Sequence, residues 1–127
     1  MKKGFTLIEV SAAAALLAVC AVTFAQLIAF AASERVAERT RRTATDQLQN
    51  VFEHLAATES QKLVAGDFDK TPFESLIERS LPDGKIVFET KTLESRNAIF
   101  AVTVSWSNGE KRPRKEVAMF RLLAISQ

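Results

Sequence analysis

One acidic side chain at the head of a long apolar segment is the first candidate for chemistry. Glu9 follows the run Gly-Phe-Thr-Leu-Ile at residues 4–8, and residues 10–32 carry no charge. At the centre of a membrane-spanning helix an acid costs about 2.5 to 3.5 kcal/mol, and less near an end, so such acids are usually paired. If a peptidase cuts after Gly4, Phe5 acquires an α-amino group that can serve as the positive partner.

The segment behind Glu9 is long enough to cross a membrane. At about 1.5 Å per residue, residues 10–32 make a helix of about 35 Å, against a hydrocarbon core of about 30 Å. Ser11, Thr23 and Gln26 are polar but uncharged, and a helix satisfies its own backbone hydrogen bonds in lipid. A cleaved secretory signal would have a shorter apolar region. We therefore expect a membrane-spanning helix over residues 5–32.

The order of residues at the start of the chain resembles the class III leader of type IV pilins and type II secretion pseudopilins. Lys2 and Lys3 precede the glycine, the aromatic residue, the acid and the apolar span. The resemblance implies that residues 1–4 are a leader, that a prepilin peptidase cuts after Gly4, and that the new N-terminus, Phe5, is N-methylated. It also implies that Glu9 pairs with the N-terminal amine of a neighbouring subunit during filament assembly.

Composition limits the remainder of the chain to one small domain. The chain has 127 residues, and a domain built from residues 33–127 buries only a limited fraction of its surface. Removal of two leader lysines from 17 basic residues leaves 15, equal to the 15 acidic ones, so charge does not favour nucleic acid as a partner. We find no combination of nucleophile, base and orienting group. The sequence predicts no catalytic residue, no cofactor and no small-molecule substrate.

Three other candidates for chemistry have simpler interpretations. Cys20 is the only cysteine, which excludes an intrachain disulfide. His54 is the only histidine and has no Ser or Cys at a useful spacing. Asp67 and Asp69 lack the regular ligand spacing of a calcium loop and favour a turn. We predict no metal site.

The charges around the span give conflicting indications of orientation. Lys2 and Lys3 favour a cytoplasmic N-terminus, but a cluster of arginines follows the span, and a count of basic residues would place that side inside. The cluster comprises Arg35, Arg39, Arg41 and Arg42. The family resemblance implies a cytoplasmic N-terminus, because the peptidase cuts leaders at that face. We expect a single-pass inner-membrane protein with a periplasmic C-terminal domain.

Beyond the span, the helix is expected to continue over residues 33–65, since no Gly or Pro occurs there. Apolar residues recur at intervals of three and four, which places them on one helical face. They are Ala44, Leu48, Val51, Phe52 and Leu55. This amphipathic half should pack on the rest of the domain, residues 66–127.

Residues 66–127 predict a short helix and a three-stranded meander. Thr71 with Pro72 and Glu74 indicates a capped helix start, and the helix should extend to about Ser80. Branched and aromatic runs predict strands at residues 86–90, 98–106 and 115–124, with turns at residues 94–97 and at Asn108-Gly109. Trp106 should anchor the sheet on the helix. The expected fold is α+β, with a long N-terminal helix packed on a small C-terminal antiparallel sheet.

Within the family, the closing part of the chain resembles minor pseudopilins of the I type. The resemblance rests on residues 102–106, a polar loop that includes Lys111 and Arg112, Arg114, and a final apolar strand. It implies a subunit of the pseudopilus tip complex in type II secretion. The implied partners are the membrane, other minor pseudopilins and the major pseudopilin. A minor pilin of a type IV pilus or DNA-uptake system, and a single-span membrane-anchored binding module, remain alternatives.

Overall fold

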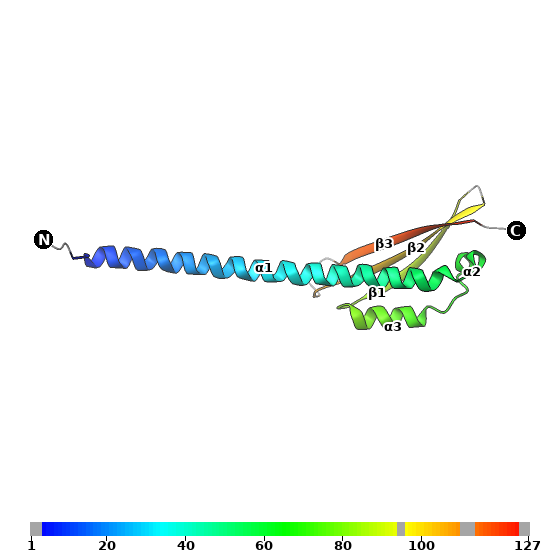
Figure 1. Cartoon of the computed structure of the whole chain (residues 1–127), viewed down its shortest axis with the longest axis horizontal. Coiled ribbons are helices and arrows are strands. Elements are labelled where there is room, and N and C mark those ends of the chain that lie inside the picture. Colours follow the sequence, from blue (N-terminus) through cyan, green and yellow to red (C-terminus); the bar gives the residue numbers. More distant parts are fainter. Residues whose placement is uncertain (1–3, 94–95, 110–113, 125–127) are drawn as a thin grey trace. The chain divides into compact units, whose positions relative to one another are not determined.

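A computed structural model of the chain describes residues 4–93, 96–109 and 114–124. The leader lysines Lys2 and Lys3, part of the turn expected at residues 94–97, and loop residues Lys111 and Arg112 lie outside the described residues. The chain divides into two compact units, Met1–Arg39 and Thr40–Gln127. Helix α1 (Leu7–Ala56) contributes to both units (Figure 1).

The first unit consists of the N-terminal part of α1 and the residues before it. None of its described residues is buried, and its large apolar side chains, from Phe5 to Val36, are exposed. By length and composition α1 qualifies as a helix that can cross a membrane. A side-chain surface of this kind is stable only where lipid or other apolar helices cover it.

The second unit combines the C-terminal part of α1 with two short helices and a sheet. The further elements are α2 (Ser60–Ala65), α3 (Thr71–Ser80), β1 (Lys85–Thr92), β2 (Asn97–Trp106) and β3 (Lys115–Ala124). The strands form one antiparallel sheet in the order β1-β2-β3. The sequence prediction of an antiparallel meander is confirmed, and the arrangement is α+β and pilin-like.

The core of the second unit lies between α1 and one face of the sheet. Four residues of α1 that the spacing predicted as one face are buried: Ala44, Leu48, Val51 and Leu55. From the sheet, alternate residues of the central strand β2 are buried: Ala98, Phe100, Val102, Val104 and Trp106. Both sets belong to one hydrophobic cluster, against which Phe52 packs. Residues that repeat with the helical period of 3.6 and residues that repeat with the strand period of 2 thus pack together in one core.

The helix is not continuous to residue 65. α1 ends at Ala56, and α2 begins only at Ser60 after a turn in which Thr58 N donates to Leu55 O at 3.0 Å. The separate helix α2 buries Leu63, which belongs to the core cluster. No Gly or Pro lies between the two helices, so the break has no local signal in the sequence.

The start of α3 also differs from the sequence expectation. The helix covers Thr71–Ser80 with Pro72 in its first turn, as expected, but Thr71 is its first helical residue and not its cap. The cap residue, Lys70, makes no side-chain capping bond. Instead, Asp69 Oδ1 accepts a hydrogen bond from Thr71 N at 3.0 Å. One of the two candidate calcium ligands therefore caps a helix.

The connection between α3 and β1 is tightly packed against the end of the sheet. A Cβ on Gly84 would lie 2.6 Å from Ile77 O and 2.9 Å from Leu81 Cβ, so only glycine fits. Arg114 forms an ion pair with the Asp83 carboxylate, and its Nη2 donates to Asp83 O at 2.8 Å. The same nitrogen donates to Ser105 Oγ at 3.2 Å. Arg114 therefore fastens the turn before β1 to the end of β2.

Candidate functional site at the start of α1

The candidate site residues lie at the beginning of α1, where Thr6 and Glu9 form reciprocal hydrogen bonds. Thr6 N donates to Glu9 Oε2 at 2.8 Å, and Thr6 Oγ1 donates to the same oxygen at 3.0 Å. In return, Glu9 N donates to Thr6 Oγ1 at 3.4 Å. Since α1 begins at Leu7, Thr6 occupies the N-cap and Glu9 the third helical position. This pattern is a capping box.

The capping box supplies Glu9 with partners in its own chain. Val10 N donates to Thr6 O at 3.1 Å, which closes the first turn of the helix. The carboxylate lies beside backbone N–H groups that have no acceptor within the helix, where the helix dipole also favours negative charge. Pairing with an amine is therefore not needed for Glu9 to be hydrogen-bonded. Its pairing with a neighbouring subunit stays a prediction.

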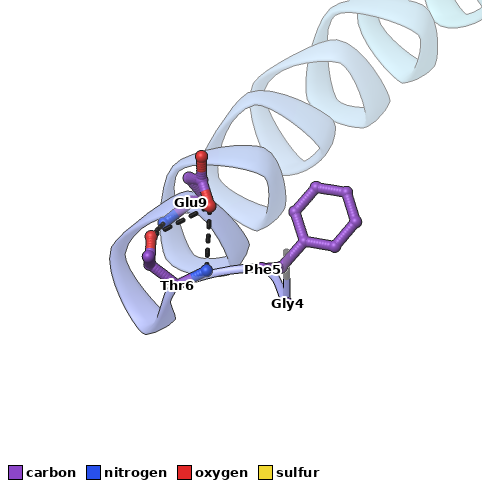
Figure 2. A pocket seen from close by; sticks show the side chains of 4 residues that line it. All are labelled: Gly4, Phe5, Thr6 and Glu9. Carbon is purple, nitrogen blue, oxygen red and sulfur yellow. Dashed lines mark hydrogen bonds between the residues drawn. The ribbon is translucent and has the colours of Figure 1, made fainter. Parts of the chain in front are cut away.

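Phe5 and Gly4 lie beside this box without taking part in it. The Phe5 side chain is 86% exposed, and its ring points away from Glu9 (Figure 2). A Cβ on Gly4 would meet no heavy atom within 4 Å. Packing therefore does not require glycine at this position, and any requirement for it must come from a molecule that recognises the segment.

Sequence reasoning did not identify Thr6 as a functional residue. The signal was present, because a threonine three residues before a glutamate at the head of an apolar run is the pattern of a capping box. The same pattern was instead interpreted as a cap at Thr71 and Glu74, whereas in the structure Thr71 is the first helical residue and Asp69 accepts the capping bond. Because Glu9 is charged, it was interpreted as needing a positive partner outside the chain, and its role in capping its own helix was not considered.

The other candidate residues do not join this site. Cys20 is exposed on α1, and the His54 ring lies 6.3 Å from the Phe73 ring, centroid to centroid. Within residues 4–93, 96–109 and 114–124, no group of three or more His, Cys, Asp or Glu side chains is placed to hold a metal ion. Trp106 lies in the core at 2% exposure.

Comparison with known proteins identifies the N-terminal segment. No curated protein and no solved structure matches the chain. Residues 1–25 match the family model of the prokaryotic N-terminal methylation motif, and this range contains Gly4, Phe5, the capping box and much of the apolar helix. The match is consistent with processing by a prepilin peptidase and with assembly alongside other pilins. It supports a type IV pilin-like prepilin leader, and it points to a structural subunit and not to an enzyme.

Proposed function

We propose that the chain is a minor pseudopilin, a structural subunit of the type II secretion pseudopilus tip complex that supports protein export. The observation that supports the proposal is that the methylation motif of residues 1–25 includes the start of α1, and that none of the described residues of this helix up to Arg39 is buried. Such a helix needs an apolar environment outside its own chain. A membrane provides it before assembly, and the helices of other subunits provide it in a filament.

The proposal assigns a role to each part of the chain. Residues 1–4 form the leader and residues 5–32 the membrane and filament-core segment. The amphipathic part of α1 continues from residue 33 to Ala56, α2 follows within the range to residue 65, and residues 66–127 form a periplasmic domain. The N-terminus is cytoplasmic, so a prepilin peptidase at that face cuts after Gly4 and methylates the amine of Phe5. The small periplasmic domain then forms the outer surface of the assembled complex.

The capping box makes the proposed role of Glu9 more specific. Both hydrogen bonds from Thr6 to the Glu9 carboxylate end on Oε2. Oε1 can therefore accept a hydrogen bond from the methylated amine of a neighbouring subunit while the cap stays in place. A carboxylate held by its own helix is also preorganised for that contact, because its side-chain rotamer is fixed before the neighbour arrives.

The proposal is tested first by N-terminal mass spectrometry of the protein purified from its own host membrane. A chain that begins with N-methylated Phe5 is the expected result. A chain that begins at Met1 would contradict the proposal and favour a membrane-anchored binding module that keeps its leader. Cross-linking of the processed protein then identifies its neighbours. Other minor pseudopilins are expected, and type IV pilus subunits would instead establish a minor pilin.

The role of Glu9 is tested by two substitutions that separate its charge from its cap. Glu9→Gln retains an oxygen acceptor for the capping box but removes the charge that attracts an amine, whereas Glu9→Leu removes both. We expect both variants to be processed and inserted, and both to be lost from the complex. Recovery of normal assembly by Glu9→Gln would show that the cap, and not the charge, is what assembly requires.

A further inference from the structure

The two edge strands of the sheet differ in what covers them. β1 is contacted by α3, and β3 pairs with β2 on one side only. Among the described residues, no strand pairs with the other side of β3, and that edge is not lined by a helix as β1 is (Figure 1). An uncovered strand edge presents a row of backbone donors and acceptors that an extended chain can pair with.

The pairing register identifies which residues present these backbone groups. Leu93 N donates to Asn97 O at 2.7 Å, so alternate residues of β2 from Asn97 onward bond to β1 and the residues between them bond to β3. Phe100 is one of the latter, and its partner in β3 is Arg121. The alternate residues of β3 therefore direct their N–H and C=O groups away from β2. These residues are Glu116, Ala118, Phe120, Leu122 and Ala124.

The side chains of the same residues lie on the sheet face opposite the core. All five are exposed, and Phe120 and Leu122 are 71% and 64% exposed. Natural edge strands usually carry charges or prolines that discourage pairing. β3 carries Lys115 and Glu116 at its start and Arg121 near its end, has no proline, and is otherwise apolar from Val117 to Ala124. The edge thus combines free backbone groups with an apolar surface, a combination suited to strand addition.

Arg121 distinguishes between possible occupants of this edge. Its side chain is partly buried, and it shares the core-side face with its β2 partner Phe100. Suppose that a second copy paired antiparallel with β3, so that the outer faces of the two sheets lay on the same side. Arg121 would then lie opposite a β3 residue of the core-side face, which carries Lys115, Val117, Met119, Arg121 and Leu123. The core-side face of β3 contains no acid, because the only acid of the strand, Glu116, lies on the outer face. Self-pairing leaves the charge of Arg121 without a partner.

We propose that the free edge of β3 binds an extended segment of another protein. The segment adds as a fourth strand, places apolar side chains beside Phe120 and Leu122 on the outer face, and places an Asp or Glu opposite Arg121. Backbone pairing supplies the affinity and the alternating side chains supply the specificity. The inference concerns only the unit Thr40–Gln127 and does not rest on the function proposed for the N-terminal segment.

The first experiment places a photo-cross-linking amino acid, p-benzoylphenylalanine, at position 120 of the full chain in its host. The matched control carries it at position 87, because Val87 lies exposed on the opposite edge strand. After irradiation, mass spectrometry identifies the cross-linked peptide. A segment with alternating apolar residues and an acid, captured from position 120 but not from position 87, is expected. Cross-linking to a second copy, or no cross-linking, would overturn the proposal.

A second experiment tests the backbone pairing itself. Ala118→Pro removes an N–H that points away from β2, and so leaves the β2–β3 pairing intact, whereas Ala118→Val keeps this N–H. Thermal unfolding followed by Trp106 fluorescence verifies that both variants are folded. The proline variant should lower the cross-linking yield from position 120 by roughly tenfold, corresponding to the loss of a pairing free energy of about 1.4 kcal/mol. An unchanged yield in a folded proline variant would exclude strand addition.

The charge requirement is tested by exchange. Arg121→Glu should abolish cross-linking from position 120, and replacement of the identified partner acid by arginine should restore it. Failure of the exchange to restore cross-linking would exclude the proposed ion pair. Leader cleavage, measured in the same cells, should be normal in every variant, so that a defect in N-terminal processing is not mistaken for a defect at the β3 edge.

Discussion

The two parts of helix α1 share a backbone conformation and differ in how their side chains are solvated. Up to Arg39 none of the described side chains is buried, although most residues from Leu7 onward are apolar. From Thr40 to Ala56 fewer residues are apolar, yet Ala44, Leu48, Val51 and Leu55 are buried. A narrow apolar stripe can be covered by one sheet, whereas a helix that is apolar all round cannot. The first part therefore depends on surroundings that the chain does not supply.

The largest expected effect comes from truncating matched leucines in the two parts. Leu48→Ala should lower the free energy of unfolding of the second unit by about 2 to 5 kcal/mol, since it empties a buried site. Leu17→Ala, at an exposed position, should leave that free energy unchanged. Urea unfolding of the full chain in detergent, followed by the fluorescence of the only tryptophan, Trp106, measures both. Equal losses would show that the two parts of the helix unfold together.

Gly84 lies in the second unit and Gly4 in the first, so substitutions of these two glycines should have different effects. Gly84→Ala should destabilise the second unit by about 1 to 3 kcal/mol, because the new Cβ would lie too close to Ile77 O and Leu81 Cβ. Gly4→Ala should not change the unfolding transition, since a Cβ at Gly4 would meet no heavy atom within 4 Å.

A bulkier substitution, Gly4→Leu, should block leader cleavage without altering the fold. The size of the protein on gels measures cleavage, and unfolding monitors the fold. A normally processed Gly4→Leu variant would contradict the proposed cleavage site.

The capping box should affect only the first part of the helix. Thr6→Ala removes the hydroxyl that bonds Glu9 and should cost about 1 kcal/mol in the first turn, whereas Thr6→Ser should retain the cap. Hydrogen exchange of the first-turn amides in detergent should accelerate in the alanine variant alone, with Trp106 fluorescence unaffected. Unchanged exchange in the alanine variant would show that the box does not stabilise the helix start.

The smallest expected effect concerns a surface contact of the second unit. The ion pair between Arg114 and Asp83 is exposed to solvent, and such pairs contribute about 0.2 to 1 kcal/mol. Arg114→Ala removes this pair together with the hydrogen bonds to Asp83 O and Ser105 Oγ, and the part of the loss that comes from the pair should disappear in high salt. A double-mutant cycle with Asp83→Asn isolates the pair. A coupling far above this range would mean that the second unit depends on this contact as strongly as on its core.

Local patterns were sufficient to predict most of the fold. Pro72 in a first helical turn and the branched runs that became β2 and β3 are short-range signals, and the corresponding elements appear where expected. The end of α1 at Ala56 was not predictable in this way, because no Gly or Pro marks it. The contact between Arg114 and Asp83 joins residues 31 apart, for which the sequence has no local signal.

The roles predicted for Gly4, Phe5 and Glu9 stay predictions, and the geometry around these residues was not predicted. Gly4, Phe5 and Glu9 were identified by their order and spacing, and the methylation motif covers all three. The hydrogen bonds between Thr6 and Glu9 were not predicted. The interpretation of Glu9 considered only a charged partner outside the chain and not the neutral donors of Thr6, three residues away. A charge in an apolar segment should first be compared with the capping needs of its own helix.

The position of Cys20 has a practical consequence. It is the only cysteine of the chain, and its side chain is exposed on the apolar part of α1. A thiol-directed nitroxide or fluorophore would therefore attach at one defined site, with no other cysteine to be removed first. Its accessibility to lipid-soluble quenchers would report the surroundings of the helix. A quenched label in the membrane that becomes protected on assembly would record transfer of the subunit from lipid to protein as it occurs.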